Sequence, residues 1–202
     1  MALEGIADEH VESITISNSI FVNNTADKAS AIYTSISSRV DFVNLNIQGN
    51  TNTKDNGFIV IKNQVTNPTS TTSIKNCSFT ENTTVLGHGG IYIENVSSDK
   101  EGAKNLSVED SVFSNNYAQQ AAAIYISTCS WSDYITIRRT SFENNVSDER
   151  GAVYASLDVG IMEIYDNIFR NNTGIESCIA IDSNSYSHLA PSYTKLRNNT
   201  FT

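Results

Sequence analysis

A motif built on a single phenylalanine recurs along the whole chain. The segment SVFSNNYAQQAAAIYIS, residues 111–127, is nearly repeated by TSFENNVSDERGAVYAS, residues 140–156. When each copy is anchored on its phenylalanine, with an isoleucine in the second copy, successive anchors stand 26 to 34 residues apart. Such a period indicates a repeat architecture, in which one structural unit is stacked many times. The anchors are Phe21, Ile47, Phe79, Phe113, Phe142, Phe169 and Phe201.

Two apolar patterns around each anchor predict short strands. The positions seven and five residues before most anchors are apolar, as in Ile135 and Ile137 before Phe142, and such alternation is typical of a strand with one buried face. A second apolar position follows ten to twelve residues after each anchor and predicts a second strand. Small residues mostly precede it, which suits a tight inward turn. The second-strand positions are Ile32, Ile59, Ile91, Ile124, Val153 and Ile179.

These repeats predict an all-β fold, the parallel β-helix or β-solenoid. Strands that recur in the same order without two-residue hairpin turns do not build an antiparallel stack. Each strand then pairs with its equivalent one coil away, and equivalent side chains stack at about 4.8 Å. We expect about six to seven coils of 26 to 34 residues, with residues 1–202 forming a single β-helix segment. Because both ends cut through coils, we expect a fragment of a longer solenoid.

Two rows of polar residues accompany the anchors. Asparagine tolerates the left-handed conformation of tight turns, and its amide can bond both its own turn and the asparagine in the next coil. We therefore expect both rows to be structural. The row three residues before the anchors contains Asn18, Asn44, Asn76, Asp110, Arg139, Asp166 and Asn198. The row three residues after them contains Asn24, Asn50, Asn82, Asn116, Asn145 and Asn172.

Charge and hydropathy exclude several classes of partner. The formal net charge is -9 and the 13 Lys and Arg residues form no cluster, whereas phosphate binding needs a basic stripe, so we expect no nucleic-acid partner. No apolar run approaches the roughly 18 residues that span a bilayer, so we expect no direct membrane insertion of this segment. Residues 1–13 lack the regions of a signal peptide. This predicts either a cytosolic protein or an internal piece of a longer one.

The copies resemble a known family. The F-x-x-N motif occurs as FVNN, FTEN, FSNN, FENN and FRNN, and it is followed by KASAIY, HGGIY, AAAIY and RGAVY. This combination resembles the repeat of polymorphic outer membrane proteins (Pmp) and related surface β-helix proteins, over essentially the whole chain. The resemblance implies a right-handed parallel β-helix displayed on a cell surface, as in adhesins and autotransporter passengers. Many of the family's glycines are Ala, Ser or Cys here.

The chain shows no catalytic constellation. Glycoside hydrolysis needs two placed carboxylates, and no two carboxylates occupy equivalent positions of neighbouring predicted strands. The histidines stand in unrelated contexts, and the interior cysteines are too far apart for a disulfide, so we expect free thiols, no catalytic residue and no cofactor. Acidic residues gather in the turn after F-x-x-N, where a solvated turn is the simpler interpretation and a weak calcium site the alternative. These weak metal candidates are Asp27, Asp55, Asp148 and Glu149.

A row of tyrosines is the binding hypothesis. Each tyrosine follows an inward-pointing residue of the second strand, so its side chain should point outward. Stacked exposed tyrosines can form a flat platform for sugar rings or for a partner protein. They can equally be stabilising neighbours within a sheet. The row consists of Tyr33, Tyr92, Tyr125 and Tyr154.

Sequons for N-glycosylation are slightly more numerous than chance provides. The composition alone predicts roughly five Asn-x-Ser/Thr sequons, and the chain has three more than that. The excess favours a secreted glycoprotein. The candidate asparagines are Asn23, Asn76, Asn82, Asn95, Asn105, Asn145, Asn171 and Asn198.

These patterns together predict one function and leave two alternatives open. We expect a non-enzymatic structural or adhesive segment of a cell-surface or extracellular β-helix protein. Its partners would be the neighbouring coils of the parent chain and a glycan or surface protein. The interval between the second strand and the next anchor varies in length, which predicts binding loops on one side of the rod. The alternatives are a carbohydrate-active β-helix enzyme, lyase or hydrolase, and an intracellular scaffold.

Overall fold

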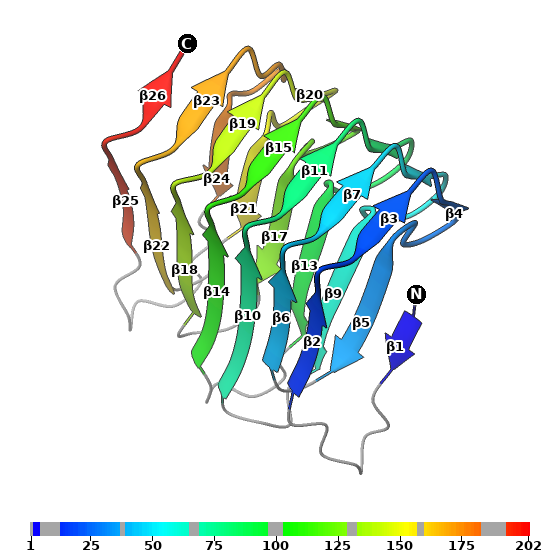
Figure 1. Cartoon of the computed structure of the whole chain (residues 1–202). Coiled ribbons are helices and arrows are strands. Elements are labelled where there is room, and N and C mark those ends of the chain that lie inside the picture. The colour runs from blue at the N-terminus through cyan, green and yellow to red at the C-terminus, as the bar shows by residue number, and fades with distance from the viewer. Residues whose placement is uncertain are drawn as a thin grey trace.

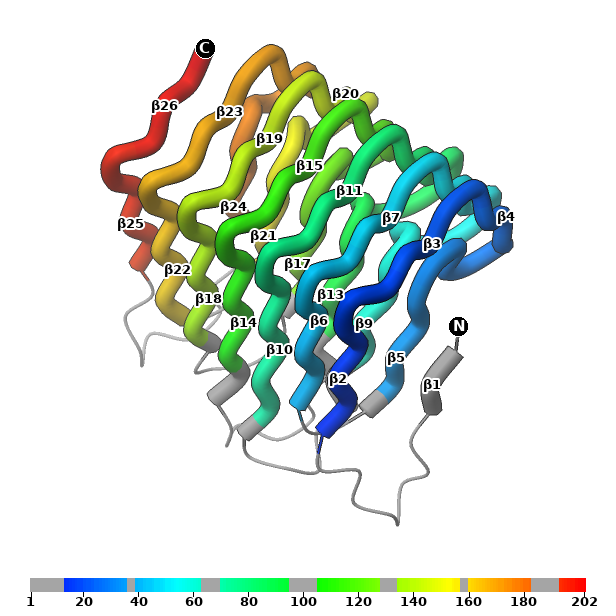
Figure 2. Tube along the Cα trace, viewed as in Figure 1, coloured from blue at the N-terminus to red at the C-terminus, as the bar shows by residue number. Residues whose placement is uncertain are grey.

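The computed structural model is an all-β parallel solenoid (Figures 1 and 2). The structure describes residues 2–4, 13–36, 39–64, 69–96, 103–128, 133–156, 160–182 and 193–202. Within these ranges, strands that recur along the sequence pair in parallel and form three seven-stranded sheets and one five-stranded sheet. The described ranges contain no helix that is long and apolar enough to cross a bilayer.

The four sheets run along the solenoid and are named A to D here. Sheet A contains β1 (Ala2–Glu4), β5 (Ile32–Ile36), β9 (Ile59–Gln64), β13 (Ile91–Val96), β17 (Ile124–Thr128), β21 (Val153–Ser156) and β24 (Ile179–Asp182). Sheet B contains β2 (Ser13–Ser17), β6 (Arg39–Val43), β10 (Thr69–Lys75), β14 (Ala103–Glu109), β18 (Asp133–Arg138), β22 (Gly160–Tyr165) and β25 (Tyr193–Arg197). Sheet C contains β3 (Ile20–Val22), β7 (Asn46–Gln48), β11 (Ser78–Thr80), β15 (Val112–Ser114), β19 (Ser141–Glu143), β23 (Ile168–Arg170) and β26 (Thr200–Phe201). Sheet D contains β4 (Thr25–Ala26), β8 (Thr51–Asn52), β12 (Thr83–Thr84), β16 (Tyr117–Ala118) and β20 (Val146–Ser147).

The number of complete turns is slightly lower than the sequence predicted. Five turns of the described chain carry a strand in all four sheets. The next turn contributes β22, β23 and β24, and it reaches sheet D only through the isolated bridge between Val146 and Thr173. The first and second predicted strands are confirmed as sheets B and A, and the anchors form sheet C. Sheet D was not predicted, because a two-residue strand is too short to show a periodicity.

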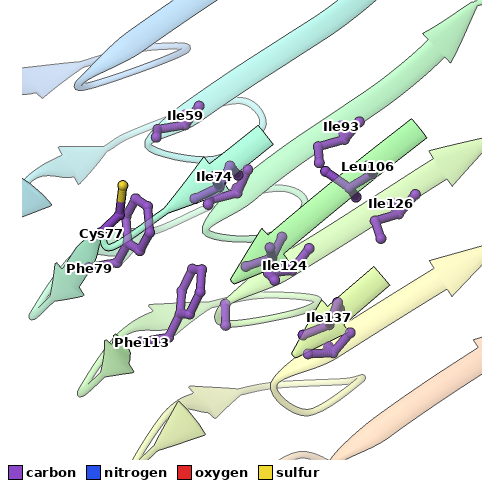
Figure 3. Packing of buried hydrophobic residues seen from close by; sticks show 14 of the residues in the cluster. Ile59, Ile74, Cys77, Phe79, Ile93, Leu106, Phe113, Ile124, Ile126 and Ile137 are labelled. Atoms are coloured by element: carbon purple, nitrogen blue, oxygen red, sulfur yellow. The ribbon is translucent and has the colours of Figure 1, made fainter. Parts of the chain in front are cut away.

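The five anchors from Phe79 to Phe201 form a continuous phenylalanine ladder. Phe79 pairs in register with Phe113, and Phe113 with Phe142. From Phe79 to Phe201 the neighbouring ring centroids lie 4.5 to 5.1 Å apart and the rings are nearly parallel. Figure 3 shows Phe79 and Phe113 in the same interior as isoleucines of sheets A and B. Each buried ring contributes about 1.5 to 3 kcal/mol through its removal from water.

The second turn fills the core with a different pair of residues. Its anchor is the smaller Ile47, and Phe58 stands where most other turns have Ala, Gly or Cys before the second strand. Phe58 is fully buried, and its ring stacks on that of Phe79 with the centroids 5.9 Å apart. In the next turn a Cβ on Gly90 would come within 2.7 Å of the Phe58 ring and of two backbone oxygens. The prediction that small residues mark a tight turn is therefore confirmed at Gly90.

The two polar rows have separate structural roles. All seven residues of the row before the anchors adopt left-handed backbone conformations, with φ between 49° and 58°. The row after the anchors forms an asparagine ladder, in which each Nδ2 donates to the Oδ1 of the next turn at 2.9 to 3.0 Å. Each Nδ2 beyond the first turn also donates to a backbone carbonyl of the preceding turn, as Asn82 does to Ile47. Both rows are structural, as predicted.

Candidate functional site

The predicted tyrosine platform is buried. Tyr92, Tyr125 and Tyr154 pair in register along sheet A, with ring centroids 5.6 and 4.7 Å apart. Their side chains point away from the phenylalanine ladder, as expected, but only 4 to 8% of their surface is exposed. Tyr33 is partly buried against the same cluster. The expectation of an exposed stripe is therefore wrong for Tyr92, Tyr125 and Tyr154.

The turn between sheets D and A covers these tyrosines. The His88 ring lies 4.5 Å from the Tyr125 ring, and the Arg150 guanidinium lies 4.1 Å from the centre of the Tyr154 ring. A Cβ on Gly89, which has a φ of 66°, would come within 2.6 Å of the Tyr125 side chain. His88 and Gly89 thus pack on the tyrosine of the following turn, whereas Arg150 packs on the tyrosine of its own turn. This arrangement favours the alternative that these rings stabilise the sheet.

The environment of Tyr154 leads to a prediction for alkaline pH. Burial, with a hydrogen bond of 2.9 Å to Asp182, raises the pKa of Tyr154 from 10.0 to about 12. The folded state holds this proton more tightly than the unfolded chain does. The protonated Tyr154 side chain therefore stabilises the fold fully at pH values below the pKa of the unfolded chain, and this stabilisation is lost as the pH rises through the pKa of the folded state. We expect an absorbance titration to show a late-ionising tyrosine that Tyr154→Phe removes. An unchanged titration would contradict the buried position.

The acidic turn residues are not assembled into a metal site. Asp27 and Asp55 lie in neighbouring turns, joined by a 2.9 Å backbone hydrogen bond. Asp27 is engaged by Lys54 at 2.6 Å, and this bond lowers the pKa of Asp27. The other two candidates lie in the fifth turn, where Asp148 accepts a hydrogen bond from a tyrosine hydroxyl at 2.8 Å. Among the described residues no three His, Cys, Asp or Glu side chains are grouped to hold a metal.

The eight sequon asparagines fall into different environments. Asn82 and Asn145 are fully buried members of the asparagine ladder, and their Nδ2 atoms are occupied by hydrogen bonds. A glycan at either position is incompatible with the folded chain, because it would displace those bonds. The side chain of Asn95 lies outside the described residues. The exposed candidates are Asn23, Asn76, Asn105, Asn171 and Asn198.

We expect glycan occupancy to follow this division. When the chain passes through a eukaryotic secretory pathway, the Asn82 and Asn145 side chains should carry little or no N-glycan, whereas Asn23 and Asn171 should accept it. Glycopeptide mass spectrometry measures each site separately. Asn23 and Asn171 serve as matched controls, since both are exposed residues in left-handed turns next to the ladder. High occupancy at Asn145 in folded protein would contradict the buried ladder.

A surface groove that sequence reasoning missed lies where sheets B and C meet. It has a volume of about 280 Å³ and involves the fourth, fifth and sixth turns. The groove exists because Ser141 is small, while the residues paired with it in the two neighbouring turns are Val112 and Ile168. The residues that line it are Asp110, Ser111, Val112, Arg139, Thr140, Ser141, Asp166 and Ile168.

Charged side chains form the rim of this groove. Arg139 makes a two-pronged ion pair with Asp110, with contacts of 2.6 and 3.0 Å, and it reaches Glu109 at 3.3 Å. This hydrogen bonding with Arg139 lowers the pKa of Asp110, although burial opposes it. Beside it, Arg138 pairs with Glu109 at 2.8 Å and donates to Tyr165 at 3.2 Å. The rim therefore presents fixed guanidinium and carboxylate groups of both signs.

Comparisons with protein-family models, with curated proteins and with solved structures find no match to this chain. Two described cysteines, Cys77 and Cys178, are free thiols as expected. Burial raises the pKa of the Cys77 thiol. Burial also raises the pKa of the Cys178 thiol, to about 11. His10, His188 and Cys129 lie outside the described residues.

The sequence did contain a signal for the groove. In the row before the anchors, every member is Asn or Asp except Arg139. In the row directly before the anchors, the small Ser141 stands between Val112 and Ile168. Each row alone looks like ordinary surface variation. Their coincidence in one turn would have indicated a recess with an unusual charged residue at its edge.

Proposed function

We propose that this chain is a non-enzymatic structural and adhesive segment of a right-handed β-helix protein at a cell surface or outside the cell. We further propose that its repeats are of the Pmp-like kind that they resemble. The observation that carries the proposal is the continuity of the ladders. The rings stack from Phe79 to Phe201, and the amides bond from Asn24 to Asn172, so these recurring residues hold successive turns of the rod together.

The surroundings of the strand carboxylates support a non-enzymatic role. Glu109 pairs with Arg138 and Glu94 with Lys62, each at 2.8 Å. Glu163 accepts a hydrogen bond from a tyrosine hydroxyl at 2.9 Å. Each carboxylate thus stands beside a cation or hydroxyl of a neighbouring turn. Hydrolysis of a glycoside needs two carboxylates facing one bond, and this pairing does not supply that arrangement.

A stacked rod suits adhesion for a mechanical reason. Each turn of a solenoid contacts only its neighbours, so the rod extends without a closed core and holds surface features at fixed spacing. The asparagine ladder adds hydrogen bonds between turns to the strand pairing. Such a segment would carry binding features away from a surface in a defined orientation. Neighbouring coils of the parent chain, and a glycan or a surface protein, are the partners that this role requires.

The proposal is tested first by looking for cleavage. The purified chain is incubated with acidic polysaccharides, with and without calcium, while absorbance from unsaturated products and the release of reducing ends are followed. We expect neither signal to exceed that of heat-denatured protein. Steady product formation would replace the structural role with the lyase or hydrolase alternative.

A second test addresses location. Native material is treated with a glycosidase that removes N-glycans, and the mass change is measured. A loss of mass confined to exposed sequons supports a surface or extracellular role. Native protein with all sequons unmodified, recovered from the cytosol, would favour the intracellular scaffold instead.

A further inference from the structure

The groove at Ser141 combines an apolar recess with a polar rim. Val112 and Ile168 form its walls, and they are two strand spacings apart, about 9.6 Å. Both are about 40% exposed, whereas Ser111 and Thr140 are buried beneath. A recess of about 280 Å³ has room for one small ring. A suitable ligand therefore has an apolar face for the walls and polar edges for the rim.

The rim has both donors and acceptors that remain available. The Arg139 side chain is 43% exposed and uses Nε and Nη2 in its ion pairs, which leaves Nη1 without a partner among the described residues. Asp166 lines the groove and makes no side-chain hydrogen bond or ion pair within the described part of the chain. Arginine only donates, whereas an ionised carboxylate only accepts. Hydroxyl groups, which do both, can satisfy the two together.

The charges on the rim narrow the class of ligand. An anion would meet Asp110, Asp166 and the nearby Glu109, and a cation would meet Arg139 and Arg138. A neutral molecule carrying adjacent hydroxyls avoids both repulsions. Sugar rings have this chemistry, because their C–H faces pack on apolar walls while their hydroxyls bond to charged planar groups.

The backbone of Arg139 is a second, independent observation. Arg139 has a φ of 49°, at a position where the other six turns place Asn or Asp. A bulky residue in the left-handed region is held under strain, and such positions concentrate at functional sites. Among the seven described turns, this row therefore has a guanidinium only in the turn where the groove lies.

We propose that the groove is a binding site for a neutral saccharide, with one sugar ring over Ser141 and its hydroxyls bonded to Arg139 and Asp166. The proposal rests on the adhesive role proposed above and gives it a ligand class. It also moves the sugar-binding surface from the buried tyrosines of sheet A to the junction of sheets B and C.

The test uses the whole chain produced in bacteria, so that Asn76 and Asn198 near the groove carry no glycan. Isotope-labelled protein is titrated with β-1,4-linked tetrasaccharides of glucose, mannose and N-acetylglucosamine. An oligogalacturonate and a glutamate-rich peptide serve as acidic comparators. We expect saturable shifts of the Arg139 Nε–H and the Ser141 amide with at least one neutral saccharide at millimolar affinity. Binding by the acidic probes alone, or by no probe, would overturn the proposal.

Two variants test where the saccharide binds. A third variant tests whether a Ser→Val substitution elsewhere in sheet C changes the affinity. Ser141→Val fills the groove, and it should fold because Val and Ile already occupy this position in the neighbouring turns. Arg139→Asn restores the turn residue of other coils, so the melting temperature should not fall. Both should weaken binding about tenfold or more. Ser78→Val, at the equivalent position of the third turn, should leave affinity unchanged. Equal affinities for Ser141→Val and Ser78→Val would refute the assignment.

The two proposals fail in distinguishable ways. Absence of saccharide binding leaves the rod and its ladders in place, since those depend on residues outside the groove. Cleavage of a polysaccharide would instead reject the non-enzymatic role, whatever the affinity of the groove.

Discussion

Phe113→Ala is expected to lower the free energy of unfolding by about 3 to 5 kcal/mol, the cost of removing a buried ring and leaving a cavity. Phe113 is fully buried, with its ring 4.5 Å from that of Phe79 and 5.1 Å from that of Phe142. Neighbouring turns cannot collapse into the gap, because their strands are fixed by pairing on both sides. Urea unfolding followed by circular dichroism measures the change.

Phe201→Ala is the matched control for this substitution. Phe201 belongs to the same ladder and stacks at 5.1 Å on its neighbour, but it is 53% exposed in the last described strand. Its removal should cost clearly less than that of Phe113. Equal losses at the two positions would mean that the ladder does not form the central core.

Asn116→Ala is expected to cost about 3 kcal/mol or more, even though it removes only a small polar side chain. The Asn116 amide makes four hydrogen bonds. Its Oδ1 accepts from the backbone N–H and the Nδ2 of Asn82, both at 3.0 Å. Its Nδ2 donates to the Phe79 carbonyl at 2.9 Å and to Asn145 at 3.0 Å. Alanine would leave buried donors and acceptors in both neighbouring turns without partners.

The control for the asparagine ladder is Asn24→Ala. Asn24 is exposed, and within the described ranges its side chain bonds to Asn50 only, at 2.9 Å. We expect a loss well below that at Asn116, measured by the same urea unfolding. A neutral Asn116→Ala would show that water replaces the amide, and the ladder would then be a consequence of the fold rather than a cause of it.

The ladders could be predicted from the sequence because they depend on local spacing. An inward-pointing position recurs each time the chain completes one turn. The sequence alone therefore shows that Phe113 and Phe142 occupy equivalent positions in successive turns. The same reasoning identified Asn116 and Asn145 as ladder members. Sequence spacing sets which residues stack, and stacking in turn determines the register of the sheets.

The exposure of residues outside the core could not be predicted in the same way. Strand alternation placed Tyr125 correctly on the outer face of sheet A. Whether that face meets water depends on the path of the preceding turn, where His88 packs on the ring, and no periodicity encodes that path. The sequon pattern has the same weakness, since it selects Asn145 without regard to its buried amide. The groove was missed because it arises from residues in three turns.

The asparagine ladder also gives the rod a direction. In each of the five bonds between Asn24 and Asn172, the Nδ2 of one turn donates to the Oδ1 of the next turn towards the C-terminus. Aligned amide dipoles of this kind polarise one another, so each added turn strengthens the bonds already formed. All the hydrogen bonds of the ladder thus point in the same direction along the rod. A turn stacked in the opposite sense would place its amide oxygen against the amide oxygen of a neighbouring turn. Side chains, and not only the backbone, therefore require that every turn be stacked in the same sense.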